Sequence, residues 1–81
     1  MARVSGKTDE DGLLPKLGSV IRTERLTRRL SQEELAHAAG IDRSHMGKIE
    51  RGERNVTILN LARIARVLKL RPSSLIDAAG F

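Results

Sequence analysis

The sequence contains no cysteine, no tryptophan and no tyrosine, and Phe81 is its only aromatic residue. Without cysteine, the chain can form neither a disulfide framework nor a thiolate zinc site. The near absence of aromatic rings argues against binding of RNA or single strands by base stacking, which needs aromatic platforms. No apolar run approaches the length of a membrane span, and the N-terminus lacks the apolar segment of a signal peptide. We therefore expect a soluble, cytoplasmic protein.

The length and charge of the chain narrow the class of protein further. Eighty-one residues predict one domain, without a separate catalytic or effector-binding domain. His37 and His45 have no ligand cluster around them, so we expect no metal, no cofactor and no small-molecule effector. No nucleophile–base constellation is present, which argues against an enzyme. The net charge of +5 favours a polyanionic partner, although the basic residues between positions 63 and 71 are equally explained as a solvated helix face.

Residues 31–52 carry the most informative pattern in the chain. Ser31 is a predicted N-cap, and Glu34 three residues later completes a capping box. Gly40 is placed where a helix commonly ends in a left-handed residue. Asp42 is the next predicted N-cap, and a basic segment follows it. This pattern predicts two short helices joined by a tight turn.

Apolar and small residues in the same segment follow helical spacing. Ala36 suits the point where two helices cross steeply, because only a small side chain fits there. The predicted apolar contacts are Leu35, Ala39, Ile41, Met46 and Ile49. A plain αα-hairpin would share some of these features, but few hairpins combine a capped first helix, glycine at the turn and a basic second helix. We interpret the segment as a helix-turn-helix.

The rest of the chain has helical periodicity and no strand pattern. Residues 1–12 are polar and aperiodic, which predicts a flexible N-terminal tail. Helices are expected over about residues 15–28, 32–39, 43–51, 58–68 and 72–79. The predicted fold is all-α: a compact bundle of five short helices, with the helix-turn-helix at helices 2 and 3 of a domain spanning residues 13–81.

The stretch from Leu17 to Leu75 resembles the phage-repressor-type helix-turn-helix family, which includes the lambdoid Cro and repressor domains. Within it, DRSHMGKIERGERNVT is similar to the controller proteins of restriction–modification systems. The resemblance implies a homodimeric, sequence-specific transcription regulator that binds a palindromic operator in double-stranded DNA. Because no ligand domain is predicted, occupancy of the operator would follow the concentration of the protein itself, which suits an autoregulated restriction–modification controller or a small phage-type repressor. An antitoxin of a toxin–antitoxin pair and a protein-interaction adaptor without specific DNA contact are the alternatives.

The predicted recognition helix carries the candidate base contacts. The N-terminal part of such a helix enters the major groove, where side chains reach the edges of the bases. Arg43 and Lys48 can both reach the guanine acceptors O6 and N7, Ser44 can donate or accept, and His45 can reach a base or a phosphate. The resemblance implies base contacts at the positions of Arg43, Ser44 and Lys48.

Candidate contacts to the DNA backbone flank the recognition helix. Gln32 opens the preceding helix, whose N-terminus can hold a phosphate oxygen. Arg51, Arg54 and Asn55 lie in the basic segment that follows the recognition helix, and the resemblance implies backbone contacts for Arg54 and Asn55. Gly47 lies inside the helix, where glycine is unfavourable. It either allows a close approach to DNA or faces solvent.

Two further features concern the architecture around the recognition helix. The resemblance implies a partly buried ion pair between Arg25 and Glu50, with a phosphate contact as the alternative role of Arg25. Arg29 stands where the family often has glycine, so it either adopts a positive φ with strain or the turn has another shape.

The C-terminal third has more apolar residues than a small monomeric core needs. The candidates for a dimer interface are Ile58, Val67, Leu70, Ile76, Ala78 and Phe81. The alternative is that these side chains cover the core of their own subunit.

Overall fold

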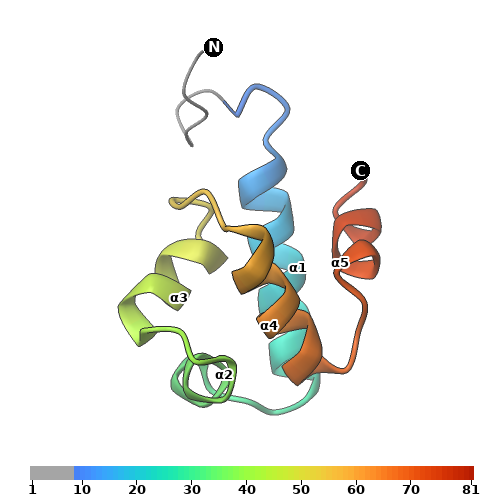
Figure 1. Cartoon of the computed structure of the whole chain (residues 1–81). Coiled ribbons are helices and arrows are strands. Elements are labelled where there is room, and N and C mark those ends of the chain that lie inside the picture. The colour runs from blue at the N-terminus through green and yellow to red at the C-terminus, as the bar shows by residue number, and fades with distance from the viewer. Residues whose placement is uncertain (1–8) are drawn as a thin grey trace.

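The computed structural model describes residues 9–81, which form five α-helices and no strand (Figure 1). The helices are α1 (Leu13–Thr27), α2 (Gln32–Ala39), α3 (Arg43–Glu50), α4 (Ile58–Leu68) and α5 (Pro72–Ala78). The predicted all-α fold of five short helices is confirmed. Residues 1–8 of the predicted flexible tail lie outside the described residues.

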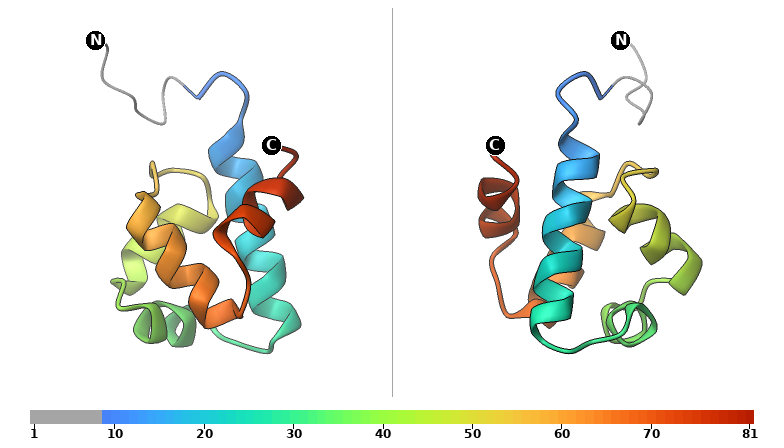
Figure 2. Two further views of the ribbon diagram at one scale, coloured as in Figure 1. Left: turned by 45° about the vertical axis from the view of Figure 1, so that its right-hand side comes forward. Right: turned by 180° about the vertical axis from the view of Figure 1, so that it is seen from behind.

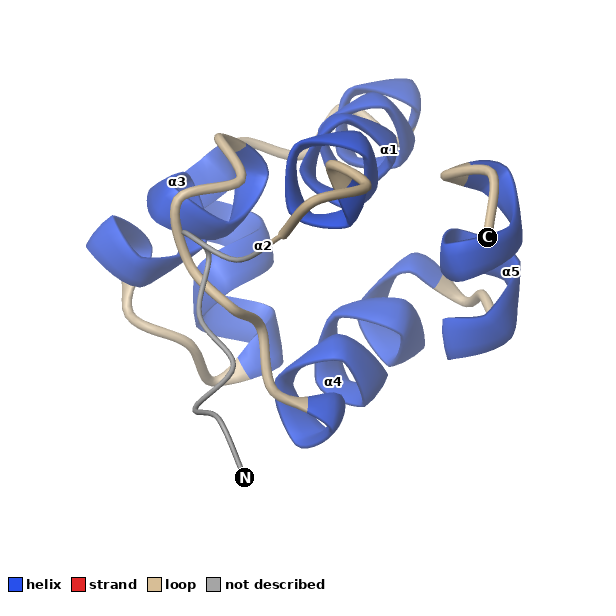
Figure 3. Cartoon of the chain, turned by 90° about the horizontal axis from the view of Figure 1, so that it is seen from above, coloured by secondary structure: helices blue, strands red, loops and turns tan. Residues whose placement is uncertain are grey.

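Helices α1 and α4 run through the middle of the molecule with their C-terminal ends at the same end (Figures 1 and 2). Viewed from above, α2 and α3 lie on one side of these two helices and α5 lies on the other (Figure 3). The helix-turn-helix therefore occupies one flank of the bundle, with α3 on the outside. This arrangement leaves the outer face of α3 open to a partner.

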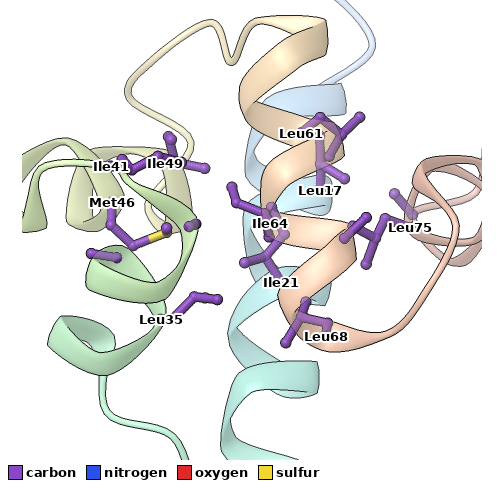
Figure 4. Packing of buried hydrophobic residues seen from close by; sticks show 14 residues of the cluster. Leu17, Ile21, Leu35, Ile41, Met46, Ile49, Leu61, Ile64, Leu68 and Leu75 are labelled. Carbon is purple, nitrogen blue, oxygen red and sulfur yellow. The ribbon is translucent and has the colours of Figure 1, made fainter.

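The core lies where the five helices meet (Figure 4). The largest fully buried side chains are Ile21, Leu35, Met46, Ile64, Leu68 and Leu75. Every helix contributes at least one of them, so the core joins all five elements. Full burial of each such side chain contributes about 1.5–3 kcal/mol. All the apolar positions predicted for the helix-turn-helix are buried, as is Ala36 at the crossing of α2 and α3.

The starts of α2 and α3 follow the predicted caps, and α4 begins at a cap of the same kind. The Ser31 hydroxyl accepts from the Glu34 amide at 2.9 Å, and the Glu34 carboxylate accepts from the Ser31 amide at 2.7 Å. Asp42 accepts from the Ser44 amide at 3.1 Å, and Thr57 caps α4 in the same way. The donors around Glu34 and Asp42 favour the ionised carboxylates, so the pKa of each is lowered: by the Ser31 amide at Glu34, and mainly by the Ser44 hydroxyl at Asp42.

Helix α1 begins two residues earlier than the sequence predicted, at Leu13 instead of Pro15. Asp9 explains the difference, because its carboxylate accepts from the amides of Leu13 at 2.9 Å and Leu14 at 2.8 Å. Gly12, with φ of 67°, lets the chain turn between this cap and the helix. The predicted tail included residues 9–12, whereas these residues form the start of the folded domain.

All five helices end in the same way, with a residue of positive φ whose successor donates to a carbonyl five residues back. These residues are Gly40, Gly52, Gly80, Arg29 and Lys69. Arg29 has a φ of 57°, so of the two possibilities considered for that turn the one with a positive φ at Arg29 is correct. Arg29 and Lys69 therefore hold a strained backbone conformation where glycine would be unstrained.

Candidate nucleic-acid interface

A polar hollow opens between the N-terminal end of α2 and the outer face of α3. It is lined by Gln32, Asp42, Arg43, Ser44, Gly47, Lys48 and Arg51. Five of the eight residues predicted to contact DNA are therefore on one surface, although they come from two helices. His45, Arg54 and Asn55 do not line the hollow. Its wall is cationic, because three basic side chains surround it and one carboxylate lies among them.

The position of α3 is fixed by a buried ion pair. Arg25 Nε lies 2.7 Å from Glu50 Oε2, and Arg25 Nη2 donates to Glu50 Oε1 at 3.1 Å. Both side chains are almost inaccessible, with exposed fractions of 9% for Arg25 and 3% for Glu50. Arg25 Nη1 also donates to the Leu30 carbonyl at 2.9 Å, so all three guanidinium nitrogens have a partner. In this arrangement Arg25 is directed into the protein and not toward a phosphate.

The same carboxylate also positions Gln32. The Gln32 Nε2 donates to Glu50 Oε1 at 3.1 Å, which links the first residue of α2 to the last residue of α3. A Cβ atom on Gly18 of α1 would lie 2.5 Å from the carbonyl oxygens of Ile49 and Glu50. The backbones of α1 and α3 therefore touch at this point. These contacts hold α1, α2 and α3 as one unit behind the hollow.

The candidate base contacts differ in their freedom to meet DNA. Arg43 and Ser44 are exposed on the first turn of α3, while His45 and Lys48 are half-buried. The Ser44 hydroxyl donates to the Asp42 carboxylate. Because its hydrogen is used there, Ser44 can only accept a hydrogen bond from a base. Asp42 therefore restricts what Ser44 can recognise, a role that its prediction as an N-cap did not include.

One of the candidate contacts to the DNA backbone after α3, Arg51, has an acidic partner. Arg51 pairs with Glu53 through two hydrogen bonds of 2.9 and 3.3 Å. The pairing lowers the pKa of Glu53 and raises the pKa of Arg51. Arg54 and Asn55 are exposed in the loop before α4. Sequence reasoning missed Glu53, although an acidic residue two positions after a predicted phosphate contact is a visible signal.

The residues predicted for a dimer interface fall into two groups. Val67, Leu70 and Ile76 are partly buried and pack against the core of their own subunit. Ile58 has an exposed fraction of 79% and Phe81 one of 48%. The exposed Ala78 lies on α5.

The first two residues of α4 are apolar and exposed. Leu59 follows Ile58 and has an exposed fraction of 68%. It was not among the residues predicted for the dimer interface. Phe81 lies at the C-terminus, with its ring centre 5.3 Å from the Lys16 ammonium. Ile58 and Leu59 are therefore adjacent apolar side chains with little contact to their own subunit.

Residues 9–81 contain no group of three histidine, cysteine, aspartate or glutamate residues arranged to hold a metal. None of the described helices combines the length and the apolar character needed to cross a membrane.

Two capped helices that cross at a small residue, are joined at a left-handed glycine and display a cationic outer face define a helix-turn-helix protein. The chain belongs to the helix-turn-helix family, whose sequence model, described as "Helix-turn-helix", matches residues 21–75.

Relatives of known type give the same assignment. The control protein C.BamHI of Bacillus amyloliquefaciens is 38% identical over 61 residues, which cover 74% of this chain and 75% of that protein. The crystal structure of the restriction–modification controller protein C.AhdI from Aeromonas hydrophila has a TM-score of 0.75 and 44% identity, covering 76% of this chain and 94% of that one. SinR, a master regulator of biofilm formation solved in complex with DNA, has a TM-score of 0.72 and 32% identity over 75% of this chain and 98% of that one. The resemblance to restriction–modification controller proteins is thereby confirmed.

Proposed function

We propose that this protein is a homodimeric transcription regulator that binds a palindromic operator in double-stranded DNA. The observation that carries the proposal is the cationic surface of α2 and α3, where Gln32, Arg43, Ser44, Lys48 and Arg51 surround one hollow. The net charge of +5 supports a polyanionic partner. SinR, which shares the fold, was crystallised with DNA.

The dimensions of α3 fit the major groove of B-DNA. With its side chains an α-helix is about 10–12 Å in diameter, and the major groove is about 12 Å wide. With the first turn of α3 in the groove, the planar guanidinium of Arg43 can pair with O6 and N7 of one guanine. Lys48 lies further along the same helix and reaches a neighbouring base, and Ser44 accepts from an amino group of adenine or cytosine.

Phosphate contacts from both sides of the groove orient the helix. Gln32 at the start of α2 meets the backbone on one side. Arg51, Arg54 and Asn55 meet it after α3, and His45 adds a further polar contact near the bases. These contacts supply affinity and position, while the side chains on the first turn of α3 supply sequence preference.

A single recognition helix reads only a few base pairs, so we infer two copies on two half-sites about one helical turn apart. The dimer interface is centred on Ile58 and Leu59 at the start of α4, because these side chains are exposed and apolar. Ile58→Asp tests this assignment without disturbing the fold. Aspartate is favourable at the first position of a helix, and position 58 has little contact with the core. Substitutions at Leu70 or Ile76 would also damage the subunit core, where both side chains pack.

Sedimentation equilibrium measures the outcome for the wild type and Ile58→Asp. We expect a wild-type dimer and a folded, monomeric variant that binds a palindromic operator weakly. A wild type that stays monomeric at tens of micromolar and binds one half-site tightly would contradict the dimer. Dimers that survive the substitution would place the interface elsewhere, on the other apolar residues of α4 and α5.

Autoregulation within a restriction–modification system is the biological role that we propose, supported by the similarity to C.BamHI and C.AhdI. The site of action is the cytoplasm, where the operator DNA lies. Genes for a methyltransferase and an endonuclease beside the gene of this protein would agree with this role. A toxin gene in that position would indicate an antitoxin instead.

Binding of Arg43→Ala to operator and random duplexes tests the proposed DNA contact. We expect a loss of about 1–3 kcal/mol on the operator, with relaxed preference at one position in each half-site. An equal loss on both duplexes would make Arg43 a phosphate contact. A wild type without any sequence preference would indicate a protein-interaction adaptor.

A further inference from the structure

Glu53 carries a negative charge next to the cationic surface of α2 and α3. It follows the end of α3, and two of the proposed DNA contacts, Lys48 and Arg51, precede it closely in the sequence. A carboxylate in this position opposes the binding of a polyanion. The contacts that Glu53 makes in the free protein indicate what it does there.

The backbone fixes the position of Glu53 beside the recognition helix. Gly52 has a φ of 73°, which lets the chain turn back at the end of α3. The amide of Glu53 then donates to the carbonyl of Lys48 at 2.8 Å. Residue 53 is therefore tied to the last turn of α3, and its side chain starts from a defined place next to that helix.

The Glu53 carboxylate binds the guanidinium of Arg51 through both of its oxygens. Oε2 accepts from Nε at 2.9 Å, and Oε1 accepts from Nη2 at 3.3 Å. The third nitrogen, Nη1, lies over Gly47, where a Cβ atom would be 3.1 Å away from it. A phosphate pairs with arginine through the same two parallel hydrogen bonds. Glu53 therefore takes the place on Arg51 that a DNA phosphate would take.

The pair is strong enough to form and weak enough to be replaced. The pKa of Glu53 is lowered, chiefly by the hydrogen bonds from Arg51 and further by the positive charges of Arg51 and Lys48. The carboxylate is thus ionised at neutral pH. The side chains are more than half exposed, 58% for Arg51 and 54% for Glu53. Because ion pairs in such exposed positions are weak, a phosphate can displace the carboxylate.

We propose that Glu53 is an internal competitor for the DNA phosphate that binds Arg51. In the free protein the carboxylate holds Arg51, and in the operator complex Arg51 exchanges the carboxylate for phosphate oxygens. Binding must break the Arg51–Glu53 pair, so operator affinity is lower than the cationic surface alone would give. This inference rests on the proposed function and adds to it the residue that sets the protein concentration at which the operator is filled.

Glu53→Gln removes the charge of the competitor and keeps the length of the side chain. We expect affinity for an operator, selected by the wild type from random duplexes, to rise about threefold to fivefold, the scale of one exposed ion pair. The melting temperature should stay close to that of the wild type, because the amide of residue 53 still donates to Lys48.

The matched control is Asp77→Asn, which makes the same change of net charge at an exposed position on α5. Helix α5 lies on the opposite side of the bundle from α2 and α3 (Figure 3), so this variant should leave operator affinity nearly unchanged. An equal gain from Asp77→Asn and Glu53→Gln would reduce the effect to net charge and overturn the proposal.

A double-mutant cycle with Arg51→Ala shows whether Glu53 acts through Arg51. We expect Glu53→Gln to raise operator affinity in the wild-type background and to have a clearly smaller effect in the Arg51→Ala background. Equal gains in both backgrounds would overturn the proposal, because Glu53 would then act without its partner.

Unchanged operator affinity of Glu53→Gln would overturn it as well. A loss of affinity would also do so, and would make Glu53 a contact to the amino group of a base instead. These outcomes are separate from failure of the proposed function, which the wild type alone would show by binding all duplexes equally.

Discussion

Removal of the Glu50 carboxylate should destabilise the whole domain and not only the DNA surface. Glu50→Ala leaves Arg25 Nε and Nη2 and the Gln32 amide without their acceptor. Loss of one partner from a buried pair lowers stability by about 3–5 kcal/mol, because an uncompensated charge remains inside. A domain of this size has a total stability of about 5–15 kcal/mol. At about 4–8 °C for each kcal/mol, the melting temperature should fall by at least about 12 °C.

A double-mutant cycle separates the pair from its surroundings. Arg25→Met combined with Glu50→Leu removes both charges, and the double variant should melt higher than either single variant. Operator affinity is compared at a temperature where circular dichroism shows every variant folded. Glu50→Ala should still bind more weakly, because Gln32 and α3 lose their shared anchor. An unchanged melting temperature for Glu50→Ala, or strict additivity in the cycle, would refute the assignment of a buried, coupled pair.

The remaining predictions concern turns and helix caps. Gly40 and Gly52 both have positive φ, but a Cβ atom at Gly52 would lie 2.5 Å from the Pro15 Cα, whereas at Gly40 it would meet open space. Thermal denaturation should show a loss of about 1–2 kcal/mol for Gly40→Ala and a clearly larger loss for Gly52→Ala, and equal losses would contradict the close approach to α1. In acid, the caps formed by Glu34 and Asp42 should fail. Because their folded-state pKa values are lowered, their contribution is complete above the ordinary values of 4.5 and 3.8 and is lost as the pH falls through the lowered values. Melting temperatures measured between about pH 6 and pH 2.5 should therefore decline less in a variant carrying Glu34→Gln and Asp42→Asn, and identical slopes would exclude these carboxylates as the cause.

Most of the fold could be predicted because its signals are local. Ser31 with Glu34 and the stop at Gly40 are read from a few neighbouring residues, and they set the bounds of α2. The start of α1 was missed because it depends on Asp9, in a polar segment without periodicity. Only the three-dimensional turn at Gly12 brings that carboxylate to the first amides of the helix.

The candidate site was predictable as a set of residues but not as a surface. Helical spacing indicates that Arg43 and Lys48 share one helix, but the hollow needs the distance between α2 and α3, which tertiary packing sets. Two interpretations of Gly47 were open, and neither included the side chains of Gln32 and Arg51 that cover it. The exposure of Ile58 beside the partial burial of Leu70 likewise depends on how α4 meets the core.

The repeated left-handed helix stop has a consequence for the speed of folding. Each of the five helices ends through a hydrogen bond between residues only five apart, and four of them also begin with a cap from a side chain within a few residues of the helix start. Helical proteins dominated by such short-range contacts fold in about microseconds to milliseconds. The assembled DNA surface therefore becomes available almost as soon as the chain leaves the ribosome. If the protein regulates its own gene, as we propose, the delay in the feedback loop would be set by transcription and translation and not by folding.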